Sequence, residues 1–152
     1  MRSTRVSQHV NAPRERVYRA LIDSNAVANW KVPNGMTCQV HWFDPREGGT
    51  FRISLTYASA GIGKTTAHTD TYFGHFVELV PNERVVEVDE FETADAALQG
   101  KMRITITLFE EDGGTRIVGM HEGLPLGVSI EDNEAGWRMA LGKLAALVES
   151  TP

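Results

Sequence analysis

The middle of the chain alternates between apolar and polar residues with a period of two, which is typical of β-strands. The clearest runs are TFRISLTY at 50–57 and KMRITITLF at 101–109. From residue 129 to residue 150 the period becomes helical, and Trp137, Leu141, Leu144 and Val148 form one apolar stripe. Because strands followed by one long helix are typical of α+β proteins, we predict an α+β fold with this stripe packed on the sheet.

The same periodicities predict the remaining elements. Expected helix N-caps are Asn11, Ser24 and Ser129, with Asp132 completing a capping box with Ser129. Tight turns are expected at Pro81-Asn82 and in EDGGT at 111–115. The expected strands cover 4–10, 36–43, 50–57, 71–80, 84–92, 101–109 and 116–123, with two short helices over 11–23 and 24–30.

Length and charge limit the possible partners. The chain has 152 residues and a net charge of -5, with scattered Lys and Arg. One domain over 1–152 is therefore expected, with neither nucleic acid nor an anionic membrane as the main partner, since both need a basic patch. The sequence has no apolar run of roughly 20 residues, which a membrane span needs. The single Cys38 suits a reducing, cytoplasmic compartment.

A loose phosphate-loop pattern occurs at 58–65, ASAGIGKT. A phosphate loop needs a strand that leads through glycines directly into a helix. Here TAHTDTYFGHF follows, which is rich in β-branched and aromatic residues. We therefore interpret residues 58–68 as a hairpin loop between two strands, and not as a nucleotide site.

Other catalytic and metal-binding patterns are weak. His68 and Asp70 have a spacing that could ligate a metal, but no third ligand is near in the sequence. Cys38 lies in an apolar strand and is expected to be a small core residue. We therefore expect no metal and no cofactor.

Five segments resemble the START/Bet v 1-like helix-grip superfamily, in the order that the superfamily has. The branch that they resemble is the activator of heat-shock-protein-90 ATPase homologue family, which is often grouped with polyketide cyclases and lipid-transport proteins. The segments are NAPRERVYRALIDSNAVANW, REGGTFRI, GHFVELVPNERVVEV, GGTRIVGMHEGLP and EAGWRMALGKLAALVE. The resemblance implies a curved antiparallel sheet of about six or seven strands around the C-terminal helix, with a cavity for apolar molecules between them.

The resemblance also implies roles for individual residues. By analogy, Trp30 would lie near the cavity mouth, and Gly136-Trp137 would bring the long helix close to the sheet. Independently, a sheet bent around a helix leaves concave apolar space, the usual form of a small-molecule site. The candidate ligand-binding residues are Trp30, Trp42, Phe51, Ile53, Phe91, Met102, Ile104, His121, Trp137 and Leu141.

Two acids depart from the pattern of the superfamily. If Val85 and Phe91 point inward, strand alternation makes Glu87 and Asp89 point inward too, whereas exposure of both acids is the orientation we favour. Buried carboxyl groups would have raised pKa values unless a cation or hydrogen-bond donors met them. His121 shares the parity of Ile117 and is a candidate cavity residue.

Two other histidines lie in predicted strands. His75 lies in a predicted strand with apolar residues on both faces. The pattern therefore does not say whether His75 points into the cavity, and a role in ligand binding remains an alternative. His41 alternates with polar Gln39 and is expected to be exposed.

Three functions are compatible with these patterns. The favoured hypothesis is a non-catalytic binder or carrier of a small hydrophobic molecule. The second is a cyclase- or dehydratase-type enzyme that uses His121 with Glu87 or Asp89 as an acid/base pair. The third is a chaperone-ATPase activator-like interaction module, which we disfavour because the eukaryotic activators carry a separate N-terminal domain for which this chain has no room. An exposed edge strand would permit a homodimer.

Overall fold

One curled antiparallel sheet is the framework of the protein. The computed structural model describes residues 2–57 and 69–150. Seven strands follow one another in the order β1-β7-β6-β5-β4-β3-β2, so β1 and β2 are the two edges. The strands are β1 (Ser3–Val10), β2 (Met36–Phe43), β3 (Thr50–Tyr57), β4 (Thr69–Val80), β5 (Arg84–Phe91), β6 (Met102–Glu111) and β7 (Gly114–Glu122).

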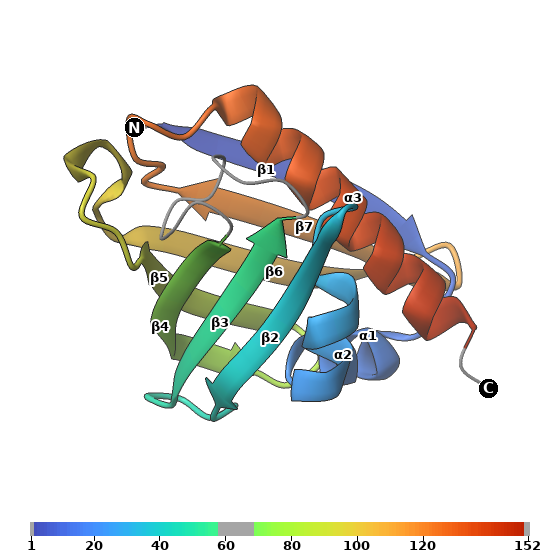
Figure 1. Ribbon diagram of the computed structural model, residues 1–152. Coiled ribbons are helices and arrows are strands. Elements are labelled where there is room, and N and C mark those ends of the chain that lie inside the picture. The colour runs from blue at the N-terminus through green and yellow to red at the C-terminus, as the bar shows by residue number, and fades with distance from the viewer. Residues whose placement is uncertain (1, 58–68, 151–152) are drawn as a thin grey trace.

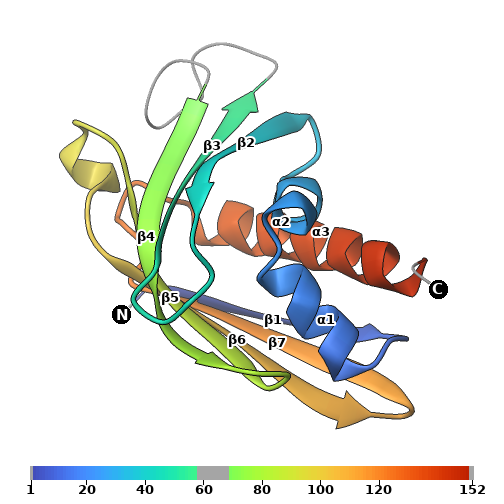
Figure 2. The same ribbon diagram turned by 90° about the horizontal axis from the view of Figure 1, so that it is seen from below.

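The helices lie on the concave side of this sheet. They are α1 (Arg14–Leu21), α2 (Ser24–Trp30) and α3 (Ile130–Glu149), with a short 3-10 helix η1 (Ala96–Leu98) that the sequence pattern did not predict. The long α3 crosses the sheet beside β1 (Figure 1). The two short helices pack between β2 and α3, at the end of the sheet where α3 finishes (Figure 2). The predicted α+β helix-grip fold is thus confirmed.

The predicted turn between β6 and β7 has the expected chemistry. Only Asp112 and Gly113 separate the two strands, and both have positive φ, 49° and 76°. Two central residues in this conformation make the turn whose twist matches paired strands. At the turn between β4 and β5, Asn82 also adopts a left-handed conformation, with φ 65°.

Two of the three expected helix caps were wrong. The residue at the N-cap of α1 is Pro13, without a side-chain bond, while the backbone N–H of Asn11 donates to Glu149 Oε2 at 2.8 Å. In α2 the cap is Asp23, whose carboxylate accepts from the N–H of Asn25. The cap of α3 is confirmed, since Ser129 accepts from the N–H of Asp132.

A β-bulge in β2 moves one predicted inward residue to the outside. Val40 pairs with Ile53, but Trp42 pairs with Arg52, so one extra residue lies between them. Beyond this point the residue that points inward is Phe43, whose ring centroid lies 5.5 Å from that of Phe76. Trp42 is 50% exposed and stacks under the guanidinium of Arg52, so its predicted place in a ligand cavity was wrong.

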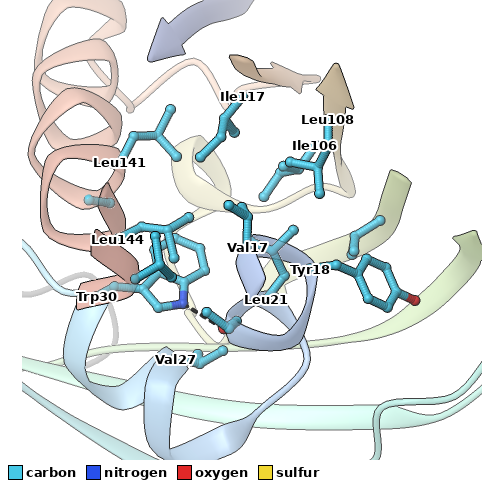
Figure 3. Packing of buried hydrophobic residues seen from close by; sticks show 14 of the residues in the cluster. Val17, Tyr18, Leu21, Val27, Trp30, Ile106, Leu108, Ile117, Leu141 and Leu144 are labelled. Atoms are coloured by element: carbon cyan, nitrogen blue, oxygen red, sulfur yellow. Dashed lines mark hydrogen bonds between the residues drawn. The ribbon is translucent and has the colours of Figure 1, made fainter. Parts of the chain in front are cut away.

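The hydrophobic core fills the end of the concave side where α1 and α2 pack. Figure 3 shows side chains from these two helices meeting those of β6, β7 and the second half of α3. Trp30 is at the centre of this contact, and its Nε1–H donates to the carbonyl of Ala20 at 2.9 Å. The labelled core residues are Val17, Tyr18, Leu21, Val27, Trp30, Ile106, Leu108, Ile117, Leu141 and Leu144.

The segment with the phosphate-loop pattern, 58–68, lies outside the described residues. The strands on either side, β3 and β4, are antiparallel neighbours, as a hairpin requires. No helix of the described chain is long and apolar enough to cross a membrane.

Gly74 tests how closely strands β4 and β5 approach each other. A Cβ built at this position would lie 2.1 Å from the carbonyl oxygen of Val88 and 2.9 Å from Phe51 Cζ. We expect Gly74→Ala to lower the free energy of unfolding by about 3 kcal/mol, because backbone must move. The exposed Gly142 of α3 has open space around its Cβ position, so Gly142→Ala should instead stabilise by up to about 1 kcal/mol. Urea unfolding of both variants measures this, and equal effects would contradict it.

Candidate functional site

A cavity of about 910 Å³ lies between the sheet and the first half of α3. It occupies the end of the concave side that α1 and α2 leave unfilled. Its wall comes from the segment after α2, the neighbouring ends of β3 to β7, η1 and α3. Its size falls within the usual range for small-molecule sites, roughly 300–1,000 Å³.

The lining of the cavity is mainly apolar. Exposed residues on α3, among them Asp132 and Met139, indicate the side on which it opens. The principal apolar lining residues are Met36, Leu55, Phe91, Leu98, Met102, Ile104, Val128, Trp137, Met139 and Ala140. Apolar surface of this kind favours an apolar ligand because contact removes both surfaces from water.

A buried ion pair lies at the border between the cavity and the core. Lys31 directly follows α2, and its Nζ donates to Glu87 Oε1 at 2.9 Å. The ammonium also lies 5.5 Å from the ring centroid of Tyr72 and 6.0 Å from that of Trp137. Burial lowers the pKa of Lys31, but the charge of Glu87 and its hydrogen bond act in the opposite direction, and the net shift is upward, so the ammonium stays charged.

The second acid, Asp89, points to the same side of β5 as Glu87. Burial raises its pKa well above the ordinary value, the neighbouring Glu87 raises it further, and Lys31 opposes the shift. The shift favours the protonated form of Asp89, and Glu87 is the carboxylate that pairs with the ammonium. Burial also raises the pKa of the Tyr72 phenol.

His121, on β7, is a neutral wall residue. Trp137 Nε1 donates to its Nδ1 at 2.9 Å, and Asn133 Nδ2 lies 3.3 Å from the same atom. Because the indole N–H can only donate, Nδ1 carries the lone pair and the proton lies on Nε2, which is 3.1 Å from the sulfur of Met102. Burial, followed by the charge of Lys31, lowers the pKa of His121 to about 4.

Half of the predicted ligand-binding residues line the cavity. These are Phe91, Met102, Ile104, His121 and Trp137. Trp30, Phe51 and Ile53 instead surround a separate hollow of about 10 Å³, the size of one water molecule, beneath Lys31. Trp30 is only 2% exposed and so does not lie at the cavity mouth. Leu141 belongs to the core.

The favoured orientation of the two acids was wrong. Glu87 and Asp89 are buried on the inner side of β5, with Val85. Lys31 makes this possible, and sequence reasoning missed it together with Tyr72. The sequence signal was present, because two acids on an apolar strand face need a cation, and Lys31 is a lone charge within the apolar stretch VANWKVP.

The remaining candidates lie away from the cavity. His41 is exposed, as expected, and His75 is exposed on the outer face of β4. Cys38 is half-buried in β2, and burial raises the pKa of its thiol, as suits a packing residue. Gly136 does not bring α3 against the sheet, because a Cβ added there would meet open space. Within residues 2–57 and 69–150, no cluster of three or more His, Cys, Asp or Glu could hold a metal ion.

Comparisons with known proteins agree with this geometry. A family model described as activator of Hsp90 ATPase homolog 1-like protein matches residues 11–149. The crystal structure of protein CV1439 from Chromobacterium violaceum is similar with a TM-score of 0.88 and 35% identity, over 99% of each chain. Protein Ms6760 from Mycobacterium smegmatis has a TM-score of 0.76 and 16% identity, over 99% of this chain and 93% of its own. A comparison with curated proteins gave no match.

The two acids should differ in their effect on stability. Glu87→Gln removes the carboxylate that pairs with the buried ammonium of Lys31, so we expect a loss of about 3 kcal/mol in the free energy of unfolding. Asp89→Asn has the shape and hydrogen-bonding groups of a protonated carboxyl, so we expect a change within about 1 kcal/mol at pH 7. Chemical denaturation of both variants tests this, and equal losses would show that Asp89 is ionised in the folded protein.

His121 should make stability depend on pH. Its folded-state pKa of about 4 lies below the ordinary value of 6.5, so the unfolded chain takes up the proton first and stability falls as the pH drops from about 6.5 towards 4. Between pH 7 and pH 5 we expect the wild type to lose about 2 kcal/mol more than His121→Gln. His75→Gln, at an exposed position, is the control and should follow the wild type.

Proposed function

The chain belongs to the family of activator of Hsp90 ATPase homolog 1-like proteins, and we propose that it binds a small, mostly apolar molecule in the cavity between the sheet and α3. This family is part of the Bet v 1-like helix-grip superfamily. The observation that carries the proposal is the cavity itself, which has a volume of about 910 Å³ and a mainly apolar wall.

The cavity is bounded mainly by secondary structure. Its walls are ends of strands in one hydrogen-bonded sheet and a helix that Ser129 caps. Rigid walls reduce the ordering that a ligand would otherwise have to cause, which favours affinity. Carriage of an apolar molecule is therefore compatible with the fold as it stands.

The contacts of the polar residues favour binding over catalysis. The ring nitrogens of His121 face Trp137, Asn133 and Met102, and no hydrogen bond in the described part joins them to Glu87 or Asp89. Lys31 is held as an ion-paired ammonium, so it lacks the lone pair that a nucleophilic amine needs. These contacts do not favour the acid/base alternative.

Filling the cavity should weaken binding. N-phenyl-1-naphthylamine, a neutral apolar dye that fluoresces in dry surroundings, is a suitable probe. We expect it to bind the wild type with micromolar affinity, and Gly136→Phe to weaken binding at least tenfold, because the new ring enters the cavity. Fluorescence titration measures both.

The matched control is Gly142→Phe. Gly142 lies in the same helix and also has open space at its Cβ position, but it is exposed and away from the cavity lining. This variant should bind the dye like the wild type. A wild type that does not bind the dye, or equal weakening in both variants, would refute binding in this cavity.

A further inference from the structure

Two polar side chains of the cavity have hydrogen-bonding atoms without partners. Tyr72 and Asp89 both line the cavity and are only 7% and 2% exposed. Within the described chain, neither Tyr72 Oη nor Asp89 Oδ1 forms a hydrogen bond. Such atoms cost free energy when buried, so native structures usually satisfy them. A polar group on the ligand would supply the missing bonds.

The charges around these atoms already balance. The ammonium of Lys31 is neutralised by Glu87 at 2.9 Å. Burial and the neighbouring Glu87 raise the pKa of Asp89, which favours its neutral form, and burial lowers the pKa of His121 to about 4, so His121 is neutral near pH 7. A charged ligand group here would be buried without a counter-charge, which is strongly unfavourable. The complementary ligand group is therefore neutral.

The directions of the hydrogen bonds narrow the class of ligand further. Glu87 accepts from Lys31 and is already engaged. A carboxyl oxygen such as Asp89 Oδ1 can accept a hydrogen bond from a ligand. The phenol of Tyr72 can both donate and accept. A hydroxyl satisfies both, because it can donate to Asp89 and accept from Tyr72, whereas an ether or a ketone cannot donate.

The two side chains are placed to meet one ligand group. Tyr72 pairs with Phe91, and Gly74 pairs with Asp89, so Tyr72 and Asp89 are diagonal neighbours on adjacent strands. Such positions lie roughly 7–8 Å apart, a span that a group between their side-chain ends can bridge. Lys31 lies over the Tyr72 ring beside them and is engaged with Glu87.

We propose that the cavity selects apolar molecules that carry a neutral hydroxyl, an alcohol or a phenol, and that Tyr72 and Asp89 bind this hydroxyl at its inner end. The proposal rests on the proposed function and adds the chemical class of the ligand. Tyr72 and Asp89 are then residues that determine specificity, while the apolar wall supplies most of the affinity.

Matched probes test the selection. The pair 2-naphthol and 2-methoxynaphthalene share one apolar body and differ in the ability to donate a hydrogen bond. We expect 2-naphthol to displace N-phenyl-1-naphthylamine from the wild type at about a tenfold lower concentration. In Tyr72→Phe and in Asp89→Leu the ratio of the two displacing concentrations should fall towards one. Asp89→Asn should keep it, because its amide oxygen can accept the same hydrogen bond.

The outcomes separate the two proposals. Dye binding by each variant shows that its cavity is intact, and Tyr72→Phe and Asp89→Asn carry the test if Asp89→Leu does not fold. Dye binding with equal displacement by both naphthalenes, or an unchanged preference in Tyr72→Phe, overturns the hydroxyl proposal and leaves the binding function standing. If neither the dye nor either naphthalene binds the wild type, both proposals are overturned.

Discussion

The incomplete filling of the concave side of the sheet is the constraint on which the rest of the molecule depends. The long α3 crosses the seven-stranded sheet, whereas α1 and α2 pack at only one end of its concave side (Figure 2). Trp30 ends this filled half with a side chain that is buried and hydrogen-bonded. The next residue, Lys31, begins the unfilled half, so the boundary between packed core and cavity lies between two consecutive residues.

The ion pair between Lys31 and Glu87 lies at that boundary. The end of α2 and strand β5, which are far apart in the sequence, meet there. Lys31 and Glu87 are charged groups that would be costly to bury without each other. The pair keeps the apolar core on one side separate from the cavity on the other. Asp89 is the second acid beside this pair, and burial, together with the neighbouring Glu87, raises its pKa.

Much of the fold could be predicted because it follows from short-range regularities. The period-two runs placed β3 and β6, the helical stripe placed α3, and the Asp-Gly pair placed the turn between β6 and β7. These features depend on neighbours in the sequence, which a single chain displays. The cap of α2 was misplaced by one residue because Asp23, Ser24 and Asn25 are all residues that can cap a helix, and that of α1 by two because its N-cap, Pro13, makes no side-chain bond.

The site was harder to predict because it depends on contacts between distant residues. Phe91, Met102 and Ile104 follow from strand parity, and they line the cavity. Lys31 could not be placed by any local period, since only the tertiary fold brings it to Glu87. The side chains of Phe51 and Ile53 point to the concave face, as strand alternation predicts, but they lie at the end of the sheet that the core fills. Strand alternation gives the face on which a side chain lies and does not say whether that end of the face is packed or open.

The extra residue in β2 has a consequence for how relatives are compared. Before it, the side chains of Cys38 and Val40 turn towards the interior, and after it the interior side chain is Phe43 rather than Trp42. A homologue without the insertion would present the opposite set of side chains at the rim of the half-barrel, although its chain would be only one residue shorter. Column-by-column alignment across this point would equate interior with surface positions, so residue correspondences in β2 should be assigned from backbone pairing with β3.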